Sequence, residues 1–599
     1  MSAGDFRFSP HPNRAAAINW HVWGDEPFRL AQKEQKPVLL SISAVWCHWC
    51  HVLDETGFSD EEVISLINRS FIPIRVDSDR RPDINVRYNN GGWPTIAFLD
   101  PDAEAIAGTT YMPPAELLNL LTEVSRLYEQ NAVEIAGAIE EVRQQRAERL
   151  KPSPGELSHD IAADALKEAA GQFDKDQGGF GSQAKFPNTA VLSLMITTLA
   201  GHDDSALLEM LTKTLDAMAA GGIHDAAEGG FFRYAMQPDW SEPHYEKMLE
   251  DNAALLSVYT GAFQLTGDGK YEQAARGIHR YLEKALLDPG SGAFSGSHDA
   301  DEAYYRLPAA EREKTPPPAV DHTVYCGWNA QAAAALLAAY QTFGDGAFRS
   351  QALGALGFIW ESMWEDSSGP YHYHDGSPHL PGMLADAAPL LGACLDAYES
   401  GAGDLWLDRA LKVAAWMLES LRDEELQEDG AGAFYDCAIA PGDRGLSSER
   451  VKPLVENSLA ASGLIRLAQV TCRPGFGDAA AGALRHFAGN SGQYGLFGAE
   501  YALAVERLLE TPVRVTISGP PEDGSTQEMI RAAHRARVPF RSLEILDPEV
   551  HGEELKDSGY GYEGKPVAYV CIGSSCQPPV SNAGDLPGRL ESGRSKASS

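Results

Sequence analysis

The sequence predicts a multidomain chain with an N-terminal α/β thioredoxin-like fold, a central all-α (α/α)6 barrel of six helical hairpins, and a small C-terminal α/β appendage. Three observations lead to this prediction. A Cys-x-x-Cys motif stands between a β-rich run and a helix. A Gly-x-aromatic pattern recurs six times through the middle of the chain, with two helical blocks between successive copies. Short β-rich runs return after residue 511.

Length and composition are those of a globular protein of several domains. The 599 residues include 44% hydrophobic and 22% charged residues, and 49 Lys+Arg against 85 Asp+Glu give a net charge of −36. At about 100–200 residues per domain, this length corresponds to about three to five domains. Because no basic stripe accompanies the acidic balance, we expect no nucleic-acid partner.

Targeting signals are not found in the sequence. The first twenty residues have no cationic start followed by an apolar run, and no stretch reaches the length of about 18 apolar residues that spans a bilayer. Eight cysteines are too few for a disulfide scaffold in a chain of this length. We therefore expect a protein of the reducing cytoplasm with no membrane partner.

The N-terminal segment has the element order of a thioredoxin fold. Residues 37–43 form a β-rich run, Cys47-His48-Trp49-Cys50-His51 follows and opens a helix, and strands are expected at 71–77 and 96–100. Pro94 stands just before the last of these strands. This order predicts a redox-active cysteine pair at the start of a helix.

The chemistry of disulfide exchange assigns a role to four residues of this segment. Cys47 at the helix N-terminus is the expected nucleophile, because the helix dipole and a positive charge on His48 favour its thiolate. Cys50, one turn later, would resolve the mixed disulfide. Pro94, if its peptide bond is cis, would shape a groove for an extended substrate.

Three other interpretations of the motif remain open. Cys-x-x-Cys-His is also the attachment signature of haem c, which requires export. A zinc site would need further ligands, and Cys571 and Cys576 would supply them if the C-terminal region folded back. The third alternative is a catalytically silent thioredoxin fold used for docking. We expect neither a metal nor a cofactor.

The Gly-x-aromatic copies begin at Gly178-Gly179-Phe180 and recur with steps of 51, 63, 77, 63 and 63 residues between aromatics. Each glycine is expected to take the left-handed conformation that ends a helix. Apolar spacing of three and four residues predicts twelve helices between and beside the motifs, and six pairs favour a closed barrel over an open solenoid. The predicted helices are 158–173, 188–200, 204–220, 247–265, 269–287, 327–343, 346–364, 383–400, 404–421, 454–471, 477–489 and 499–510.

Polar residues cluster just after these motifs, and the topology places all the motifs on one rim of the barrel. A ring of carboxylates, histidine and tryptophan is typical of a pocket for a polar ligand, carbohydrate in particular. The alternative is that the Asp and Asn residues are helix N-caps and the Trp residues belong to the core. The pocket candidates are Lys185, Arg233, Trp240, His244, Glu246, Asp251, Asp299, Asp301, Trp328, Asn329, Asp386 and Asn457.

The remaining segments complete the predicted organisation. Beyond residue 511, strands are expected at 513–517, 543–545 and 567–570 around a helix at 524–536. Cys571 and Cys576 are expected to be buried thiols at strand ends, with a second redox pair as the alternative. The four single cysteines Cys326, Cys394, Cys437 and Cys472 are expected in the core. The predicted divisions are 1–127 thioredoxin-like domain, 128–156 connecting helix and linker, 157–511 barrel, 512–585 α/β region and 586–599 disordered tail.

The chain resembles the YyaL-like thioredoxin-domain proteins, a family that includes spermatogenesis-associated homologues of animals. The resemblance starts at Trp46-Cys47-His48-Trp49-Cys50-His51, and continues through Gly91-Gly92-Trp93-Pro94 and Pro243-His244-Tyr245-Glu246-Lys247-Met248-Leu249 to Cys576-Gln577-Pro578-Pro579-Val580. It implies a thioredoxin-like domain joined to a barrel similar to sugar epimerases and glycosidases, but a fold does not determine the chemistry. The chain departs from the family pattern at Ala226 and Phe232, where histidines are expected.

Three functions follow from these observations. The first is a thiol–disulfide oxidoreductase whose barrel binds a protein client or a sugar-like ligand. The second is a carbohydrate-active barrel, epimerase-like or hydrolase-like, with His244, Glu246, Asp299 and Asp301 as general acid and base groups. The third is a non-enzymatic binding or chaperone-like module, against which an intact cysteine pair argues because unused thiols are open to oxidation.

Overall fold

The computed structural model describes residues 6–149, 153–423, 432–438 and 444–597. Two compact units make up the chain. The first consists of Met1–Pro152, Asp299–Asp301 and Asp436–Val451, and the second of Ser153–His298, Glu302–Tyr435 and Lys452–Ser599. The division at residue 152 lies inside the linker predicted at 128–156.

The first unit contains the sheet predicted from the N-terminal strands. Its strand order is β2-β1-β3-β4, with β1 parallel to β2 and antiparallel to β3. β1 lies at the centre and all six of its residues are buried, as expected for a strand covered on both faces. The elements are α1 Asp25–Glu34, β1 Val38–Ser43, α2 His48–Glu55, α3 Glu61–Ser70, β2 Ile72–Asp77, α4 Pro82–Tyr88, β3 Thr95–Leu99, β4 Ala105–Thr109, α5 Pro114–Gln130 and α6 Ala132–Arg149.

Helices cover both faces of this sheet. Side chains of β1 alternate between the two faces, so Leu39 packs in a core with residues of α3 and α5. Val38 and Leu40 pack in a second core with residues of α1 and α4. The arrangement is the α/β sandwich of a thioredoxin-like fold, with α2 starting just beyond the end of β1.

A distant segment belongs to the same unit. Residues 436–451 lie far along the sequence, yet Leu446 packs in the core beside α1 and α4. Arg87 of α4 donates to Oδ2 of Asp436 at 2.8 Å and to the backbone carbonyl of Glu449 at 2.7 Å. The sequence offered no signal that this segment packs on the first unit, because its residues show no helical or strand periodicity.

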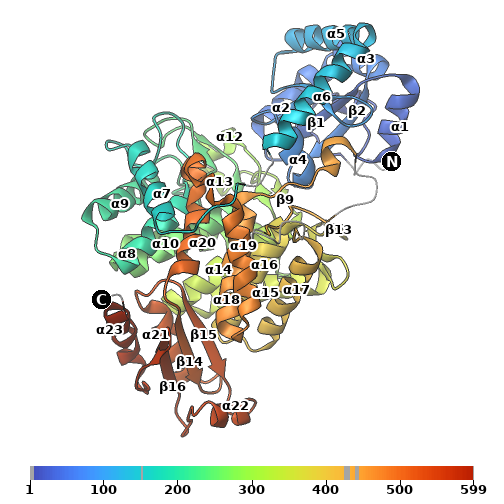
Figure 1. Ribbon diagram of the computed structural model, residues 1–599. Coiled ribbons are helices and arrows are strands. Elements are labelled where there is room, and N and C mark those ends of the chain that lie inside the picture. The colour runs from blue at the N-terminus through green and yellow to red at the C-terminus, as the bar shows by residue number, and fades with distance from the viewer. Residues whose placement is uncertain (1–5, 150–152, 424–431, 439–443, 598–599) are drawn as a thin grey trace. The chain divides into compact units, whose positions relative to one another are not determined.

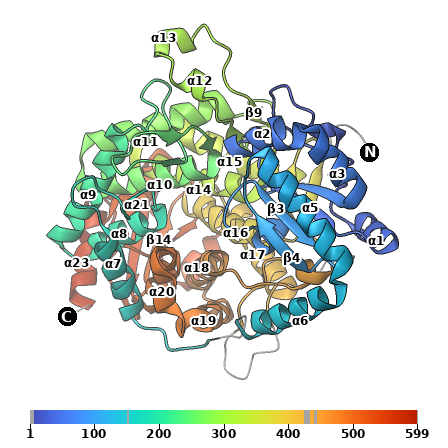
Figure 2. The same ribbon diagram turned by 90° about the horizontal axis from the view of Figure 1, so that it is seen from above.

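The second unit contains the predicted helical barrel. Six inner helices pack in a closed ring, in which α20 contacts α8, and each has an outer helix beside it (Figure 2). The twelve helices fall within a few residues of their predicted positions. The inner ones are α8 Thr189–Gly201, α10 Leu249–Thr266, α14 Cys326–Phe343, α16 Leu384–Glu399, α18 Leu454–Thr471 and α20 Ala499–Leu509, and the outer ones are α7 Asp160–Gln172, α9 Ser205–Ala220, α11 Gly269–Tyr281, α15 Gly346–Ser362, α17 Leu405–Ser420 and α19 Pro474–Ala488.

Short elements fill the connections that lead from outer to inner helices. They form small antiparallel ladders and include two short helices between residues 302 and 312. Their bounds are β5 Tyr234–Ala235, β6 Pro243–His244, β7 Lys247–Met248, β8 Ser297–His298, α12 Glu302–Tyr305, α13 Ala309–Arg312, β9 Val320–Asp321, β10 Val324–Tyr325, β11 Trp364–Glu365, β12 Gly369–His374 and β13 Pro378–Pro381.

The Gly-x-aromatic motifs have a different role from the expected one. They form turns that bring the aromatic residue back to the end of the outer helix, as where Phe231 bridges to His224 and Phe294 to Leu287. At Gly229, φ is 81° and a Cβ atom would lie 2.3 Å from the carbonyl oxygen of Gly277. Glycine is therefore required by the turn and by a close backbone approach, and not by a helix terminus.

The C-terminal region forms a second α/β layer within the same unit (Figure 1). Its strand order is β15-β14-β16-β17, with β14 parallel to β15 and antiparallel to β16. This repeats the order and strand directions of the N-terminal sheet, again with a helix between the two parallel strands. The bounds are β14 Val513–Ser518, α21 Gly524–Arg535, β15 Arg541–Leu546, α22 Gly552–Asp557, β16 Val567–Ile572, β17 Ser575–Cys576 and α23 Leu586–Ala597.

The tail predicted to be disordered is a helix over most of its length. Leu586 and Leu590 of α23 are fully buried in the core of the C-terminal sheet. The prediction rested on the polar composition of residues 586–599 and gave no weight to these two leucines, which are one helical turn apart. Residues 598–599 lie outside the described part of the chain. Within the described residues, every helix is too short or too polar to cross a membrane.

Candidate functional site

Cys47 lies at the N-terminus of α2, where the motif predicted it. It is the N-cap residue of the helix, and its Sγ accepts a hydrogen bond from the backbone N–H of Cys50 at 3.2 Å. A sulfur in this position faces the free N–H groups and the positive end of the helix dipole. Both features stabilise a thiolate more than a thiol.

Cys50 has a different environment one turn into the helix. Its side chain is 2% exposed, against 5% for Cys47, and both sulfurs are free thiols. Burial raises the pKa of the Cys50 thiol well above its ordinary value, and the neighbouring Cys47 raises it further. The pair is therefore asymmetric, with one sulfur at the helix terminus and one held protonated beneath it.

The other residues of the motif divide between solvent and core. His48 and Trp49 are exposed, and the Trp49 ring packs on Tyr111 with centroids 4.8 Å apart. His51 is buried, with Nε2 2.8 Å from the carbonyl oxygen of Val45. Its Nδ1 lies 3.9 Å from Oδ1 of Asp299, at the outer limit of an ion pair. His48 is thus the exposed histidine of the motif.

Pro94 follows a cis peptide bond from Trp93. The Trp93 ring packs edge-on against Trp46, with centroids 5.7 Å apart, so the turn before β3 contacts the residue that precedes Cys47. Trp46 in turn donates from Nε1 to Oδ2 of Asp79 at 2.6 Å. The cis geometry meets the condition attached to Pro94 in the sequence prediction.

A buried ion pair beneath the motif was missed by sequence reasoning. Arg75 of β2 makes two parallel hydrogen bonds to Asp54 of α2, at 2.8 and 2.9 Å, and both side chains are almost fully buried. The positive charge of Arg75 slightly opposes the rise in the pKa of Cys50. A charged residue in an otherwise apolar strand was the available signal, because arginine is almost never buried without a partner.

Four of the twelve barrel candidates form one cluster around the start of α10. Nδ1 of His244 lies 3.3 Å from Oε1 of Glu246, and Arg233 contacts Asp251 with 3.9 Å between Nε and Oδ2. Burial raises the pKa of the Asp251 carboxyl; Arg233 opposes this rise and Glu246 adds to it. The cluster therefore combines two carboxyl groups with one histidine and one guanidinium cation, and the carboxyl groups and the histidine are groups able to act as acid and base.

An aromatic stack extends from this cluster. His244 stacks on Tyr234 with centroids 4.4 Å apart, and Tyr234 stacks on Phe186 at 4.6 Å. The Phe186 side chain is 47% exposed. Exposed aromatic faces beside carboxyl groups are the surface that a sugar ring packs against.

Five other candidates have their polar atoms bonded inside the protein, which differs from the expected pocket role. Asn329 accepts from the backbone N–H of Phe294 at 2.8 Å and donates to its carbonyl at 3.0 Å. Asn457 bonds Phe434 in the same way. Each asparagine is the fourth residue of its inner helix, and neither is an N-cap. The other three candidates of this group are also buried. Lys185 donates to Asp174, and Trp240 donates to the carbonyl oxygen of Gln177. Asp386 accepts from the backbone N–H of Gly327 and bonds His372.

The last three candidates lie outside the cluster. Asp299 and Asp301 belong to the first unit, whereas His244 and Glu246 belong to the second. Trp328 is half-buried and packs on Tyr325 with centroids 4.4 Å apart. Asn252, which sequence reasoning passed over for its neighbour Asp251, bonds both backbone groups of Phe231. Its repeat position matches that of Asn329 and was the available signal.

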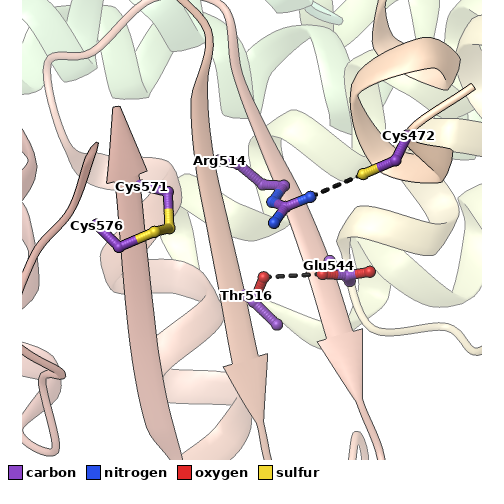
Figure 3. Close-up of a disulfide and its surroundings, with 6 residues drawn as sticks. All are labelled: Cys472, Arg514, Thr516, Glu544, Cys571 and Cys576. Carbon is purple, nitrogen blue, oxygen red and sulfur yellow. Dashed lines mark hydrogen bonds between the residues drawn. A yellow bond between two sulfur atoms is a disulfide. The ribbon is translucent and has the colours of Figure 1, made fainter. Parts of the chain in front are cut away.

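Cys571 and Cys576 form a disulfide, in contrast to the pair of buried thiols expected (Figure 3). The two residues face each other across the β16–β17 hairpin, and Cys576 is exposed. As a disulfide the pair provides no thiolate ligands for zinc.

Among the single cysteines, Cys326 and Cys394 are buried as predicted, but Cys437 is half-buried and Cys472 is exposed. Within the described residues, no group of three His, Cys, Asp or Glu side chains is arranged to hold a metal ion.

Comparison with known proteins supports the class defined by this fold. Residues 10–147 match the family model Thioredox_DsbH, described as a protein of unknown function, DUF255. Human spermatogenesis-associated protein 20 is 25% identical, covering 95% of this chain and 89% of its own length. The resemblance noted in the sequence is thereby confirmed.

Two further matches concern parts of the chain. The thiol:disulfide interchange protein DsbD of Campylobacter jejuni is 31% identical over 14% of this chain and 16% of its own length. Among solved structures, a sugar epimerase from a ruminal bacterium is 14% identical with a TM-score of 0.44, covering 55% of this chain and 86% of that chain.

Proposed function

We propose that this protein is a thiol–disulfide oxidoreductase that acts through Cys47 and Cys50. The observation that carries the proposal is the asymmetry of the pair, with Cys47 capping α2 and Cys50 buried behind it with a raised pKa. An attacking thiolate at a helix N-terminus and a protonated resolving thiol one turn later are what two-step exchange requires.

The reaction reduces a protein disulfide. The Cys47 thiolate attacks one sulfur of the client disulfide, that S–S bond breaks, and the other client sulfur leaves as a thiolate. Cys50 then loses its proton and attacks Cys47 Sγ, which releases the second client sulfur and forms the Cys47–Cys50 disulfide. The client gains two electrons and two protons, and a low-molecular-weight thiol such as glutathione returns the enzyme to its dithiol form. We assign the protein to the cytoplasm, whose reducing poise supplies that thiol.

A redox titration tests the proposal. The full chain is equilibrated in graded glutathione buffers, and alkylation with mass spectrometry follows the peptide that contains Cys47 and Cys50. We expect a reversible two-electron transition between about −120 and −270 mV, the range of thioredoxin-fold enzymes. Cys472→Ser, which removes an exposed thiol elsewhere, is the control and should leave the transition unchanged.

Two results would contradict the oxidoreductase. Thiols that never pair would indicate a silent thioredoxin fold, and a potential too reducing to exchange with glutathione would favour the binding or chaperone-like module. Loss of the transition in both Cys47→Ser and Cys50→Ser, with accumulation of a mixed disulfide only in Cys50→Ser, would establish which sulfur attacks.

A second candidate function belongs to the barrel. We propose that the cluster of Arg233, His244, Glu246 and Asp251 binds a sugar-like ligand. Two observations support this proposal: the raised pKa of Asp251 and the aromatic stack of Phe186, Tyr234 and His244. Calorimetric titration with a panel of mono- and disaccharides tests it. Heat that disappears in Glu246→Gln supports the site, and no heat with any sugar counts against it.

A further inference from the structure

A cavity of about 320 Å³ lies among the inner helices of the barrel. Its wall is formed by α8, α14, α16, α18 and α20 and by Phe540, which immediately precedes β15 of the C-terminal region. None of the twelve candidates predicted for the barrel pocket is among its lining residues. The volume is at the lower end of the range of about 300–1,000 Å³ typical of small-molecule sites.

Two charged side chains of α20 face this cavity. Glu500 and Arg507 are seven residues apart, which is two helical turns, so they project from the same face of the helix. The guanidinium carbon of Arg507 lies 4.7 Å from the centre of the Phe540 ring. Within the described residues, neither charged group has a hydrogen-bond or ion-pair partner in the protein.

The other two arginines around the cavity already have hydrogen-bond partners. Arg466 of α18 pairs with Asp396 at 2.6 Å and with Glu399 at 3.0 Å. Arg541 donates to the carbonyl oxygens of Val538 and His534. Arg507 is therefore the cation of this cluster that has its donors available.

The titrating groups of the cluster shift the balance toward positive charge. Burial raises the pKa of Glu500 to about 7 and also raises the pKa of Glu399. Burial lowers the pKa of His534 to about 3, so this ring is neutral near pH 7. Burial lowers the pKa values of Arg507 and Arg541 to about 10, so both side chains stay charged near pH 7. With Glu500 protonated, the carboxylates of this cluster in the described part of the chain are Asp396 and Glu399, against three arginines, Arg466, Arg507 and Arg541.

We propose that this cavity binds a small hydroxylated oxyanion, a carboxylate or a phosphate ester, whose anionic group is held by Arg507. The guanidinium offers a planar fork of donors that matches either group, and the Phe540 ring supports the guanidinium. Thr197, Gln331 and Ser462 are the uncharged polar residues of the wall and bind the hydroxyl groups. The site is separate from the cluster of Arg233, His244, Glu246 and Asp251, and it does not depend on the cysteine pair.

Binding is coupled to protonation of Glu500. An anion in the cavity raises the Glu500 pKa above its value of about 7 in the free protein. The affinity is then highest below that pH and falls as pH rises through the interval between the free and bound pKa values. Between the free and bound pKa values, the ligand therefore enters together with a proton.

The test is calorimetric titration of the full chain carrying Glu246→Gln, which removes sugar binding at the cluster of Arg233, His244, Glu246 and Asp251, with gluconate, glycerol phosphate and glucose. We expect heat with gluconate or with glycerol phosphate, which distinguishes a carboxylate from a phosphate ligand, and none with neutral glucose. Arg507→Gln should weaken binding about tenfold or more, the value of a hydrogen-bonded charge. The control Arg485→Gln removes an exposed arginine of α19 and should bind as the unchanged protein does.

Glu500→Gln provides a second variant. Glutamine has nearly the same size as glutamate, but it is uncharged and does not titrate. It should keep the affinity and abolish its dependence on pH. Equal binding of glucose and the anions, unchanged affinity in Arg507→Gln, or a pH dependence of gluconate binding that survives in Glu500→Gln would each overturn the proposal. If Arg507→Gln fails to fold, the pH dependence of the Glu500→Gln variant decides.

Discussion

The two cysteines of the motif show how one helical turn changes the chemistry of a residue. Cys47 is the N-cap of α2 and receives the N–H of Cys50, whereas Cys50 lies inside the helix and its pKa is raised by burial. Exposed area alone would not separate them, since both are buried. The position relative to the helix terminus therefore decides the assignment of nucleophile and resolving thiol.

This asymmetry predicts the order of alkylation. In the reduced protein, iodoacetamide should modify Cys47 about tenfold or more faster than Cys50, because only the thiolate reacts and its fraction falls tenfold for each unit of pKa increase. Peptide mass spectrometry at successive times measures both rates. In Cys47→Ser, Cys50 should stay slow, and fast modification of Cys50 in that variant would contradict the assignment.

His298 of β8 is a buried base next to a cation. Its Nδ1 has no hydrogen-bond partner within the described residues, and the ring packs near Tyr281. Burial lowers its pKa to about 4, with the charge of Lys247 as the next cause; His322 and Lys284 also lower it and Asp225 opposes. The native state therefore holds this histidine neutral in mildly acidic solution.

The sign of the pH effect follows from that pKa. Between the unfolded value of about 6.5 and the native value of about 4, the unfolded chain binds more protons, so the free energy of unfolding falls as pH decreases. In His298→Asn this decrease should be smaller, by up to about 2 kcal/mol in the free energy of unfolding at about pH 5. Urea denaturation at several pH values measures it. The exposed His202→Asn is the control, and an equal change in both variants would contradict the prediction.

At the scale of elements, a turn and an asparagine together join the end of an outer helix to the next inner helix at three connections of the barrel. Gly229-Gly230-Phe231 returns the chain to the end of α9, and Asn252 of α10 bonds both backbone groups of Phe231. The same pairing joins Phe294 to Asn329 and Phe434 to Asn457. A buried backbone N–H and C=O are satisfied each time, which explains asparagine at these positions without a ligand.

Gly229→Ala tests the turn. A methyl group there meets the carbonyl oxygen of Gly277, and φ is in the left-handed region. We expect a loss of at least about 2 kcal/mol in the free energy of unfolding, measured by urea denaturation. Gly357→Ala is the matched control, because a Cβ in that position of α15 has no neighbour within 4 Å and alanine favours a helix by up to about 1 kcal/mol. Equal effects of the two substitutions would exclude the close approach as the cause.

At the scale of the whole molecule, two α/β sheets share one strand order but only the first carries the cysteine pair. β1 leads into Cys47 and α2, whereas β14 leads into Gly519 and Pro520 before α21. The only disulfide among the described residues lies instead on the β16–β17 hairpin (Figure 3). The C-terminal region contributes Phe540 to the wall of the barrel cavity.

The last helix is part of that sheet's core. Leu590→Ala should lower the free energy of unfolding by about 2–5 kcal/mol, as expected when a fully buried leucine leaves a cavity. Ser592→Ala on the exposed side of α23 should change it by less than about 0.5 kcal/mol. Thermal denaturation of both variants measures the difference. A Leu590 variant as stable as the control would show that the segment is not packed.

Much of the architecture follows from local patterns. The cysteine motif between a strand and a helix, the apolar spacing of twelve helices and the strands after residue 511 each depend on residues close in the sequence, and the elements form where those patterns indicate. Residues 586–597 show the limit of this approach, because two leucines in a polar segment carry no reliable periodicity without the surface on which they pack.

The sequence by itself determined which segments become helices and strands and which cysteine begins a helix, since backbone geometry and side-chain periodicity are local. Only the tertiary structure decided which polar residues share a space. It separated the Arg233–Asp251 cluster from Asn329 and Asn457, paired Cys571 with Cys576 through the register of a hairpin, and brought Arg507, Arg466 and Phe540 around one cavity. Burial and charge depend on distances between segments far apart in the chain, and these distances exist only after the ring of helices closes.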